Sequence, residues 1–127
     1  MSVTILSTFP AQVGLDPSDS RTIAFDWDAR SLRASVTIST STFTITAIRQ
    51  SGATALTKDN ASILNAADAT TVCERTVGAS RVTQVRLIAT TATEGDDYEL
   101  ANTITTSESP SQTKTLSCLV RIRNQGT

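Results

Sequence analysis

The sequence contains no histidine, and its 127 residues include only three phenylalanines, one tryptophan and one tyrosine. Histidine is the side chain that most often serves as a general base and as a transition-metal ligand, so its absence argues against a conventional catalytic triad. The two cysteines, Cys73 and Cys118, are too few to hold a structural zinc ion by themselves. We therefore predict a protein without catalytic residues, metal sites or cofactors.

Long apolar runs and strong net charge are also missing. No stretch approaches the ~18 consecutive apolar residues of a transmembrane helix, and the first residues lack the basic and apolar regions of a signal peptide. The formal net charge of −1 gives no reason to expect nucleic acid or a membrane as a partner. We expect synthesis in a cytoplasm, where both cysteines stay reduced, with Cys118 buried in its strand.

β-Branched residues dominate what is present, with 23 threonines, nine isoleucines and eight valines. These side chains favour strands over helices because their χ1 angle is restricted. A chain of 127 residues is expected to form one domain with one core, and the scarcity of aromatic residues makes that core aliphatic. The composition therefore predicts an all-β domain.

The last quarter of the chain shows the strand pattern most clearly. Tyr98, Leu100 and Ile104 share one parity, and successive side chains of a strand point to opposite faces. A second set shares one face of the following stretch: Leu116, Cys118, Val120 and Ile122. The polar break at residues 108–112 has the length of a hairpin loop. We predict an antiparallel pair of strands whose apolar face needs a second sheet to cover it.

Similar patterns predict more strands in the rest of the chain. They lie at residues 21–27, 32–40, 42–50, 71–77 and 81–91. Residues 53–71 stay open between a surface loop and a short helical turn capped by Asn60. Gly95 followed by Tyr98 at the start of a strand is typical of the tyrosine corner of immunoglobulin domains. About seven strands with turns between them predict an Ig-like antiparallel β-sandwich, and a small jelly roll or barrel is the alternative.

The N-terminal segment, residues 1–20, is predicted to be an arm outside a sandwich domain at residues 21–127. Pro10, Gly14 and Pro17 interrupt any long strand or helix there. The apolar side chains of the arm would prefer the surface of a neighbouring subunit. Three of them are predicted interface residues: Phe9, Val13 and Leu15. A disordered tail or a first edge strand is the alternative.

Two arginines near the C-terminus, Arg121 and Arg123, are also predicted interface residues. They point away from the apolar face of their strand, and arginine is enriched at interfaces, although an ordinary solvated face explains them equally well. We interpret Asp26 and Asp28 as turn and arginine-paired carboxylates rather than as a catalytic pair. The acidic turn at residues 94–99 does not have EF-hand spacing, so we interpret it as solvated rather than calcium-binding.

Several short motifs resemble those of a family of small virion proteins of tailed bacteriophages. The stretches AFDW, SVTIST, EGDDYELANTITTS and LSCLVRIRN carry the resemblance, which extends over residues 16–123. The matching residues are Asp16-Pro17, Asp26-Trp27, Gly95 to Tyr98, Asn102 to Thr106 and Arg121 to Arg123. The resemblance implies a structural or fibre-like virion component without catalysis. The Ala- and Asn-rich segment at residues 53–69 departs from the family pattern.

Two functions follow from these observations. The first is a non-catalytic virion protein, made in the host cytoplasm, that docks on the capsid, neck or tail as a decoration or adaptor. Its partners would be other virion proteins and further copies of itself. The second is a β-sandwich binding module for a host receptor or a carbohydrate. Sugar sites usually use exposed aromatic residues, and we predict that Trp27 and Tyr98 are both buried, so we favour assembly.

Overall fold

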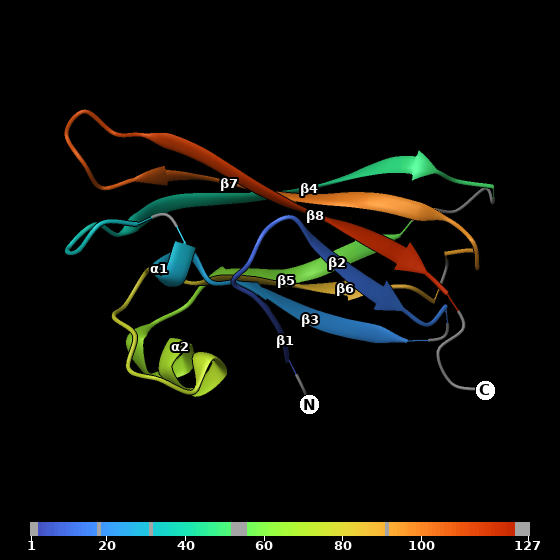
Figure 1. Ribbon diagram of the computed structural model, residues 1–127, viewed down its shortest axis with the longest axis horizontal. Helices are drawn as coiled ribbons and strands as arrows, with labels where there is room; N and C mark the ends of the chain where they lie inside the picture. Colours follow the sequence, from blue (N-terminus) through green and yellow to red (C-terminus); the bar gives the residue numbers. More distant parts are fainter. Residues whose placement is uncertain (1–2, 18, 31, 52–55, 91, 124–127) are drawn as a thin grey trace.

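A computed structural model describes residues 3–17, 19–30, 32–51, 56–90 and 92–123. Within these ranges the chain forms eight strands and two short helices, and the strands make two packed layers (Figure 1). The elements in chain order are β1 (Val3–Leu6), β2 (Ala11–Leu15), β3 (Ser20–Phe25), α1 (Trp27–Arg30), β4 (Ile38–Arg49), β5 (Thr57–Ile63), α2 (Ala66–Cys73), β6 (Thr83–Ile88), β7 (Asp97–Thr106) and β8 (Thr113–Ile122).

The two layers are four-stranded sheets, one in the order β1-β3-β6-β5 and the other in the order β2-β8-β7-β4. With β2 set aside, this is the strand order of an immunoglobulin constant-type sandwich, ABED against CFG. The predicted all-β, Ig-like sandwich is therefore confirmed, with eight strands in place of about seven. The pairing is mixed rather than wholly antiparallel, because β1 runs parallel to β3 and β2 runs parallel to β8.

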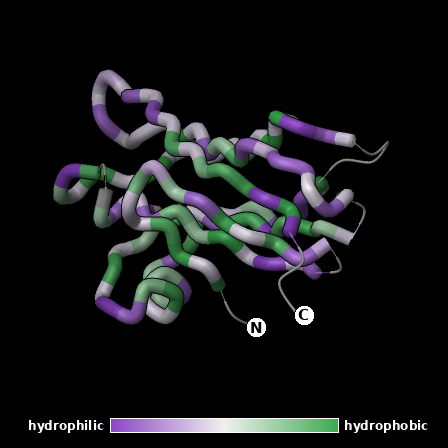
Figure 2. The backbone as a smooth tube through the Cα atoms, turned by 45° about the vertical axis from the view of Figure 1, so that its right-hand side comes forward, coloured by the Kyte–Doolittle hydropathy of each residue, from purple (hydrophilic) through white to green (hydrophobic). Residues whose placement is uncertain are grey.

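The predicted C-terminal hairpin is present. β7 and β8 are antiparallel, and their register places Tyr98 opposite Val120 and Leu100 opposite Cys118. All four side chains are buried, so the parity of the sequence identifies the inner face correctly. The loop between the two strands projects beyond the sandwich (Figure 1) and is mostly hydrophilic (Figure 2).

The prediction of a separate N-terminal arm is wrong, and so is the domain boundary at residue 20. β1 pairs with β3 in one sheet and β2 pairs with β8 in the other, so the segment crosses between the layers. Leu6, Val13 and Leu15 are only 7%, 3% and 0% exposed, because they belong to the main core. Pro10 stands between the two strands, where it divides the segment without ending its pairing. The alternative of a first edge strand is the correct one.

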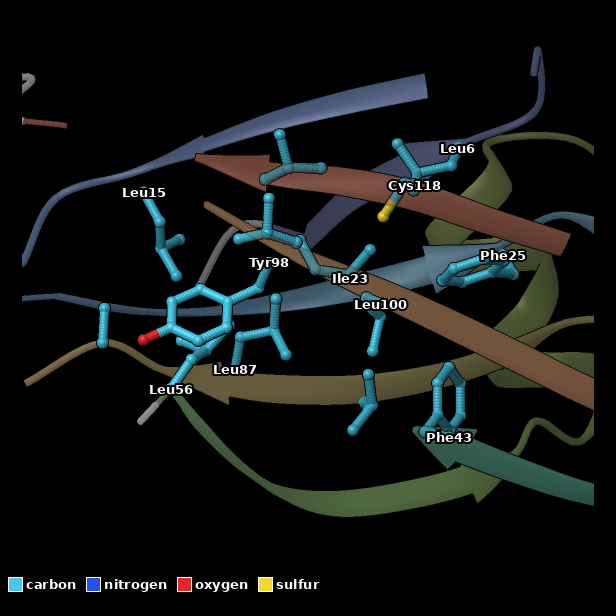
Figure 3. Packing of buried hydrophobic residues seen from close by; sticks show 14 of the residues in the cluster. Leu6, Leu15, Ile23, Phe25, Phe43, Leu56, Leu87, Tyr98, Leu100 and Cys118 are labelled. Carbon is cyan, nitrogen blue, oxygen red and sulfur yellow. The ribbon is translucent and has the colours of Figure 1, made fainter. Parts of the chain in front are cut away.

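The core lies between the two sheets and is mainly aliphatic (Figure 3). Phe25 links its aromatic members, with its ring centroid 5.7 Å from that of Phe9 and 5.7 Å from that of Phe43. Trp27 and Tyr98 are fully buried, which confirms that prediction. Trp27 is not the end of β3, as its parity suggests, but the first residue of α1.

A second, smaller apolar cluster lies on the outer side of the first sheet, beneath α2. Its buried members are Ala24, Leu64, Ala69, Val77 and Val82. Asn65 caps α2 by accepting a hydrogen bond from the backbone N–H of Asp68 at 2.8 Å, so the cap is not Asn60. The strand predicted at residues 71–77 is wrong, because β-branched residues there continue a helix whose Ala69 packs into this cluster.

β4 replaces two predicted strands with one. The strand begins at Ile38 and is 12 residues long, so the strands predicted at residues 32–40 and 42–50 are one continuous strand. Residues 32–37 do not belong to it. Ser35 has a left-handed backbone, with φ of 69°, which turns the chain before the strand. The guanidinium of Arg81 donates to carbonyl oxygens of this turn, so side-chain bonds replace a strand ladder there.

Candidate functional site

Much of the outer face of the second sheet is built from short, uncharged side chains. Alternate residues of β4, β7 and β8 point into the core, so the residues between them point outward. We call ten of these outward residues the threonine face: Thr40, Thr42, Thr44, Thr46, Ala101, Thr103, Thr105, Thr113, Thr115 and Ser117. None of the ten carries a charge, and none is fully buried. The same parity points Asp97 and Glu99 of β7 and Leu119 and Arg121 of β8 outward beside it.

Cross-strand pairing brings the hydroxyl groups of this face together. The register sets Thr40 beside Thr105 and Thr103 beside Thr115. The paired Oγ1 atoms lie 2.6 Å and 2.9 Å apart, so each pair shares a hydrogen bond. β-Branched side chains that are already ordered in this way lose little freedom on contact with a partner. The threonine face is thus a preformed polar surface that can both donate and accept hydrogen bonds.

A shallow groove adjoins one end of the threonine face. It is lined mainly by Pro10, Ile48, Glu99, Ser117 and Leu119. Ile48 is 61% exposed and is the one large hydrophobic side chain so exposed among the described residues. The groove sets a small apolar spot and the carboxylate of Glu99 beside the threonine face.

The outer face of the first sheet is different. α2 and its apolar cluster cover part of this sheet, as Figure 1 shows for the helix. Arg86 on β6 makes a bidentate ion pair with Asp59 on β5, with N–O distances of 2.8 Å and 2.6 Å. The hydrogen bond from Arg86 lowers the pKa of Asp59. Within the described parts of the chain, the threonine face is thus the part of the two outer faces that is both uncovered and uncharged.

Three of the predicted interface residues lie inside this protein instead. Val13 and Leu15 are buried in the core, and Phe9 is half-buried with its ring stacked on that of Phe25. Val13 and Leu15 are therefore not accessible to a partner, so their prediction as interface residues is wrong. Phe9 is only partly accessible. Their apolar character serves the sandwich itself, because the segment that carries them supplies an edge strand to each sheet.

The other two predicted interface residues, Arg121 and Arg123, lie at the end of β8 and share one partner. The Nη2 atom of Arg123 is 3.0 Å from Oδ1 of Asp97, and the Nε atom of Arg121 is 3.5 Å from the same oxygen. Arg123 also donates to the backbone oxygens of Asp96 and Ile122. Both arginines are half-buried in these contacts, so they form a local ion-pair cluster rather than a free cationic stripe.

The carboxylate pair Asp26 and Asp28 is held by arginines. Arg75 donates to both oxygens of Asp26, at 2.8 Å and 3.0 Å, and to Asp28 at 2.9 Å. The Nε atom of Arg81 donates to Asp28 at 2.5 Å, and this bond is the main reason that the pKa of Asp28 is lowered. The cluster ties α1 to the segments around α2, as expected for arginine-paired carboxylates.

A buried polar cluster inside the core was not predicted. The Oδ1 atom of Asn102 accepts hydrogen bonds from Trp27 Nε1 at 2.8 Å and from Thr83 Oγ1 at 2.6 Å. Its Nδ2 atom donates to Ser41 Oγ at 2.8 Å and to the backbone oxygen of Thr42 at 3.2 Å. Asn102 therefore connects both sheets and α1. The sequence signal is an asparagine at an inward position of an otherwise apolar set.

Tyr98 begins β7 as predicted, after Gly95 with its φ of 98°. Its hydroxyl lies near Leu56 (Figure 3), which precedes β5 in the other sheet. Burial raises the pKa of Tyr98, and the backbone of Leu56 partly offsets this effect. The residue thus resembles the expected tyrosine corner in its position, but its hydroxyl is directed at a distant segment.

Neither cysteine forms a disulfide, which confirms the predicted free thiols. Within the described ranges no helix is long and apolar enough to cross a membrane. The sequence matches no model of a protein family and no curated protein. The fold and its surfaces are therefore the observations from which a function is argued.

Proposed function

We propose that this protein is a non-catalytic structural component of a tailed-bacteriophage virion, which docks on the capsid, neck or tail through the threonine face. The observation that carries the proposal is that this face is ordered and uncharged over adjoining parts of three strands. Desolvating a charged surface is costly, whereas short hydroxyl-bearing side chains can exchange water for hydrogen bonds with a partner. A permanent contact within a particle suits such a surface.

The family resemblance supports the proposal through the fold. Asp26, Trp27 and Asn102 belong to two of the motifs that carry the resemblance, and all three are buried in contacts that hold the sandwich together. These motifs are therefore constrained by the architecture rather than by a ligand. A protein with the same motifs can form the same stabilising contacts, so it is expected to adopt the same sandwich. The proposed virion role is taken from the resemblance to the family.

The proposed partners are other virion proteins and further copies of this chain, and the proposed location is the particle, after synthesis in the host cytoplasm. Nucleic acid is not a proposed partner. The net charge is −1, and five arginines pair with aspartates in the same chain: Arg75, Arg81, Arg86, Arg121 and Arg123.

The alternative function, a receptor- or carbohydrate-binding module, receives less support. The single tryptophan and the single tyrosine of the chain, Trp27 and Tyr98, are both fully buried. Neither offers an exposed aromatic platform for a sugar ring. The groove beside Ile48 and Glu99 is a surface feature that such a ligand would use.

The test uses particles of the phage that carries the gene. A phage lacking the gene is complemented with the wild-type chain, with Thr115→Lys on the threonine face, or with Ser62→Lys on the exposed part of β5. Mass spectrometry of purified particles should detect the wild type and Ser62→Lys, and should show a loss of at least roughly tenfold for Thr115→Lys, the factor that about 1.4 kcal/mol of lost contact produces. Absence of the wild-type chain from particles, or equal incorporation of both variants, would overturn the proposal.

A further inference from the structure

β4 is the outermost strand of the second sheet, and one of its edges has no hydrogen-bonded strand, although β5 of the first sheet lies close to β4. β4 runs for 12 residues and pairs with β7 on one side. Among the described residues, no strand pairs with its other side. An unpaired edge presents a row of backbone N–H and C=O groups that can bind another strand.

Natural sheets usually protect such edges by short strands, proline, charged side chains or bulges. The other three edge strands follow this rule. β1 has four residues, β2 has five and follows Pro10, and β5 carries Lys58 and Asp59 beside an irregularity in its register. Three of the four edges are thus poor templates for pairing.

β4 lacks this protection over its central part. Its register shifts lie only at its ends, between Ile38 and Thr40 and between Ala47 and Arg49, so the ladder from Thr40 to Ala47 is regular. That stretch contains no proline and no charged residue. Asn102 also holds the strand in place through Ser41 Oγ and the backbone oxygen of Thr42, which reduces the cost of ordering it on binding.

We infer that β4 pairs with β4 of a second copy of this chain, antiparallel and about a twofold axis. The two four-stranded sheets then join into one continuous sheet of eight strands. An axis at Thr44 sets Thr42 opposite Thr46 of the second copy, and Phe43 opposite Ile45. Directly opposed residues share a face of the sheet, so threonines meet threonines and apolar side chains meet apolar side chains.

The neutrality of the strand favours a second copy over a different partner. In a twofold contact each residue near the axis meets the same segment of its copy, so any charge there would face a like charge. β4 has no charge before Arg49, which its own sheet sets opposite Asp97. Ile45 is half-buried at the edge beside Phe43, which is 5% exposed, so a second strand would complete the cover of both.

This dimer deepens the proposed assembly role by naming the surface that joins two copies. It leaves the threonine face open on one side of the joined sheet, so both copies can dock on the same partner. The dimer is tested with the isolated protein, whereas docking is tested with particles, so either proposal can fail without the other.

The first experiment is disulfide cross-linking in a Cys73→Ser background. Opposed residues of an antiparallel pair have Cα atoms about 4.5–5.5 Å apart, within the range of a disulfide. Thr44→Cys should therefore form a covalent dimer under mild oxidation. Thr115→Cys, on the same face but in the interior strand β8, should not. Cross-linking of Thr115→Cys without that of Thr44→Cys would mean that two copies stack face to face, and it would overturn the edge pairing.

The second experiment is sedimentation of the wild type and of two lysine variants. The wild type and Thr115→Lys should be dimers, whereas Thr44→Lys should be a folded monomer because it places two lysines at the axis. Circular dichroism checks that each variant keeps its strands. A wild type that remains monomeric overturns the inference and leaves the proposed function intact. A dimer that is absent from particles overturns the proposed function and leaves the inference intact.

Discussion

The indole nitrogen of Trp27 donates a hydrogen bond to Oδ1 of Asn102 across the core, at 2.8 Å. Trp27 begins α1, two residues after the end of β3, and Asn102 lies in the middle of β7, so the bond joins the two layers of the sandwich. Both residues are fully buried. A polar contact of this kind fixes how the sheets sit relative to each other, because a shifted packing would leave buried groups unpaired.

Replacing Asn102 with alanine should destabilise the fold strongly. The change removes the acceptor of Thr83 Oγ1 and the nearer of the two acceptors of Trp27 Nε1, which keeps only Thr83 Oγ1 at 3.2 Å. Each buried polar group left unsatisfied costs ~1–3 kcal/mol. Chemical denaturation should therefore show a loss of at least about 2 kcal/mol. The control is Thr105→Ala on the outer face of the same strand, which should cost about 1 kcal/mol or less. Equal losses for both variants would show that the buried cluster contributes nothing special.

Trp27→Ala should cost about 3–5 kcal/mol, the range for deleting a large buried aromatic side chain. Trp27→Phe should cost less, because it keeps much of the packing but loses the hydrogen bond to Asn102. Urea denaturation of both variants separates the two effects. A loss below about 1 kcal/mol for Trp27→Ala would contradict the burial of this residue.

The N-terminal segment should be essential for stability rather than dispensable. Leu15→Ala removes a fully buried side chain from β2 and should cost about 2–5 kcal/mol. Gln12→Ala changes an exposed residue of the same strand and should stay within about 0.5 kcal/mol of the wild type. Melting curves of the two variants provide the measurement. A Leu15→Ala variant as stable as Gln12→Ala would restore the idea of an independent arm.

The fold is largely predictable from sequence where one local pattern decides it. Tyr98 and Leu100 alternate with less buried residues, and Cys118 and Val120 do the same in β8, so parity alone identifies the core face. The N-terminal segment shows this pattern only briefly, because its two strands have four and five residues. They pair in parallel with β3 and with β8, the last strand of the chain. Pairing between distant segments leaves no local signal, so Pro10, Gly14 and Pro17 dominate the interpretation of this segment.

The candidate surface is only partly predictable for the same reason. The alternation of threonine from Thr40 to Thr46 is visible in the sequence, but by itself it indicates only β propensity. The threonine face exists because the register places β4 beside β7, and Thr103 beside Thr115. Arg121 and Arg123 do not form a free cationic stripe, because both form ion pairs with Asp97 on the neighbouring strand.

Acid should weaken the ion-pair cluster at α1. Hydrogen bonds from Arg81 and Arg75 lower the pKa of Asp28 below its ordinary value of 3.8. A carboxylate with a lowered folded-state pKa contributes stability above its unfolded pKa and loses it as the pH falls through the folded value. The melting temperature should therefore drop below pH ~4, and Asp28→Asn should drop less steeply there while being less stable at pH 7. Identical pH profiles would exclude this role for Asp28.

The two cysteines should differ in reactivity and should never bridge. Cys118 lies in the main core, and burial raises its pKa to about 12, so almost no thiolate exists near neutral pH. Cys73 is half-buried in α2, on the other side of the first sheet, and burial raises its pKa as well. A thiol reagent should modify Cys73 slowly in the native protein and Cys118 only after denaturation, with Cys118→Ser as the control that assigns the sites. Intact mass under non-reducing conditions should show two free thiols. A mass lower by two hydrogens would indicate a disulfide between Cys73 and Cys118. That bond would require the outer cluster beneath α2 and the main core to meet, which the intervening sheet prevents.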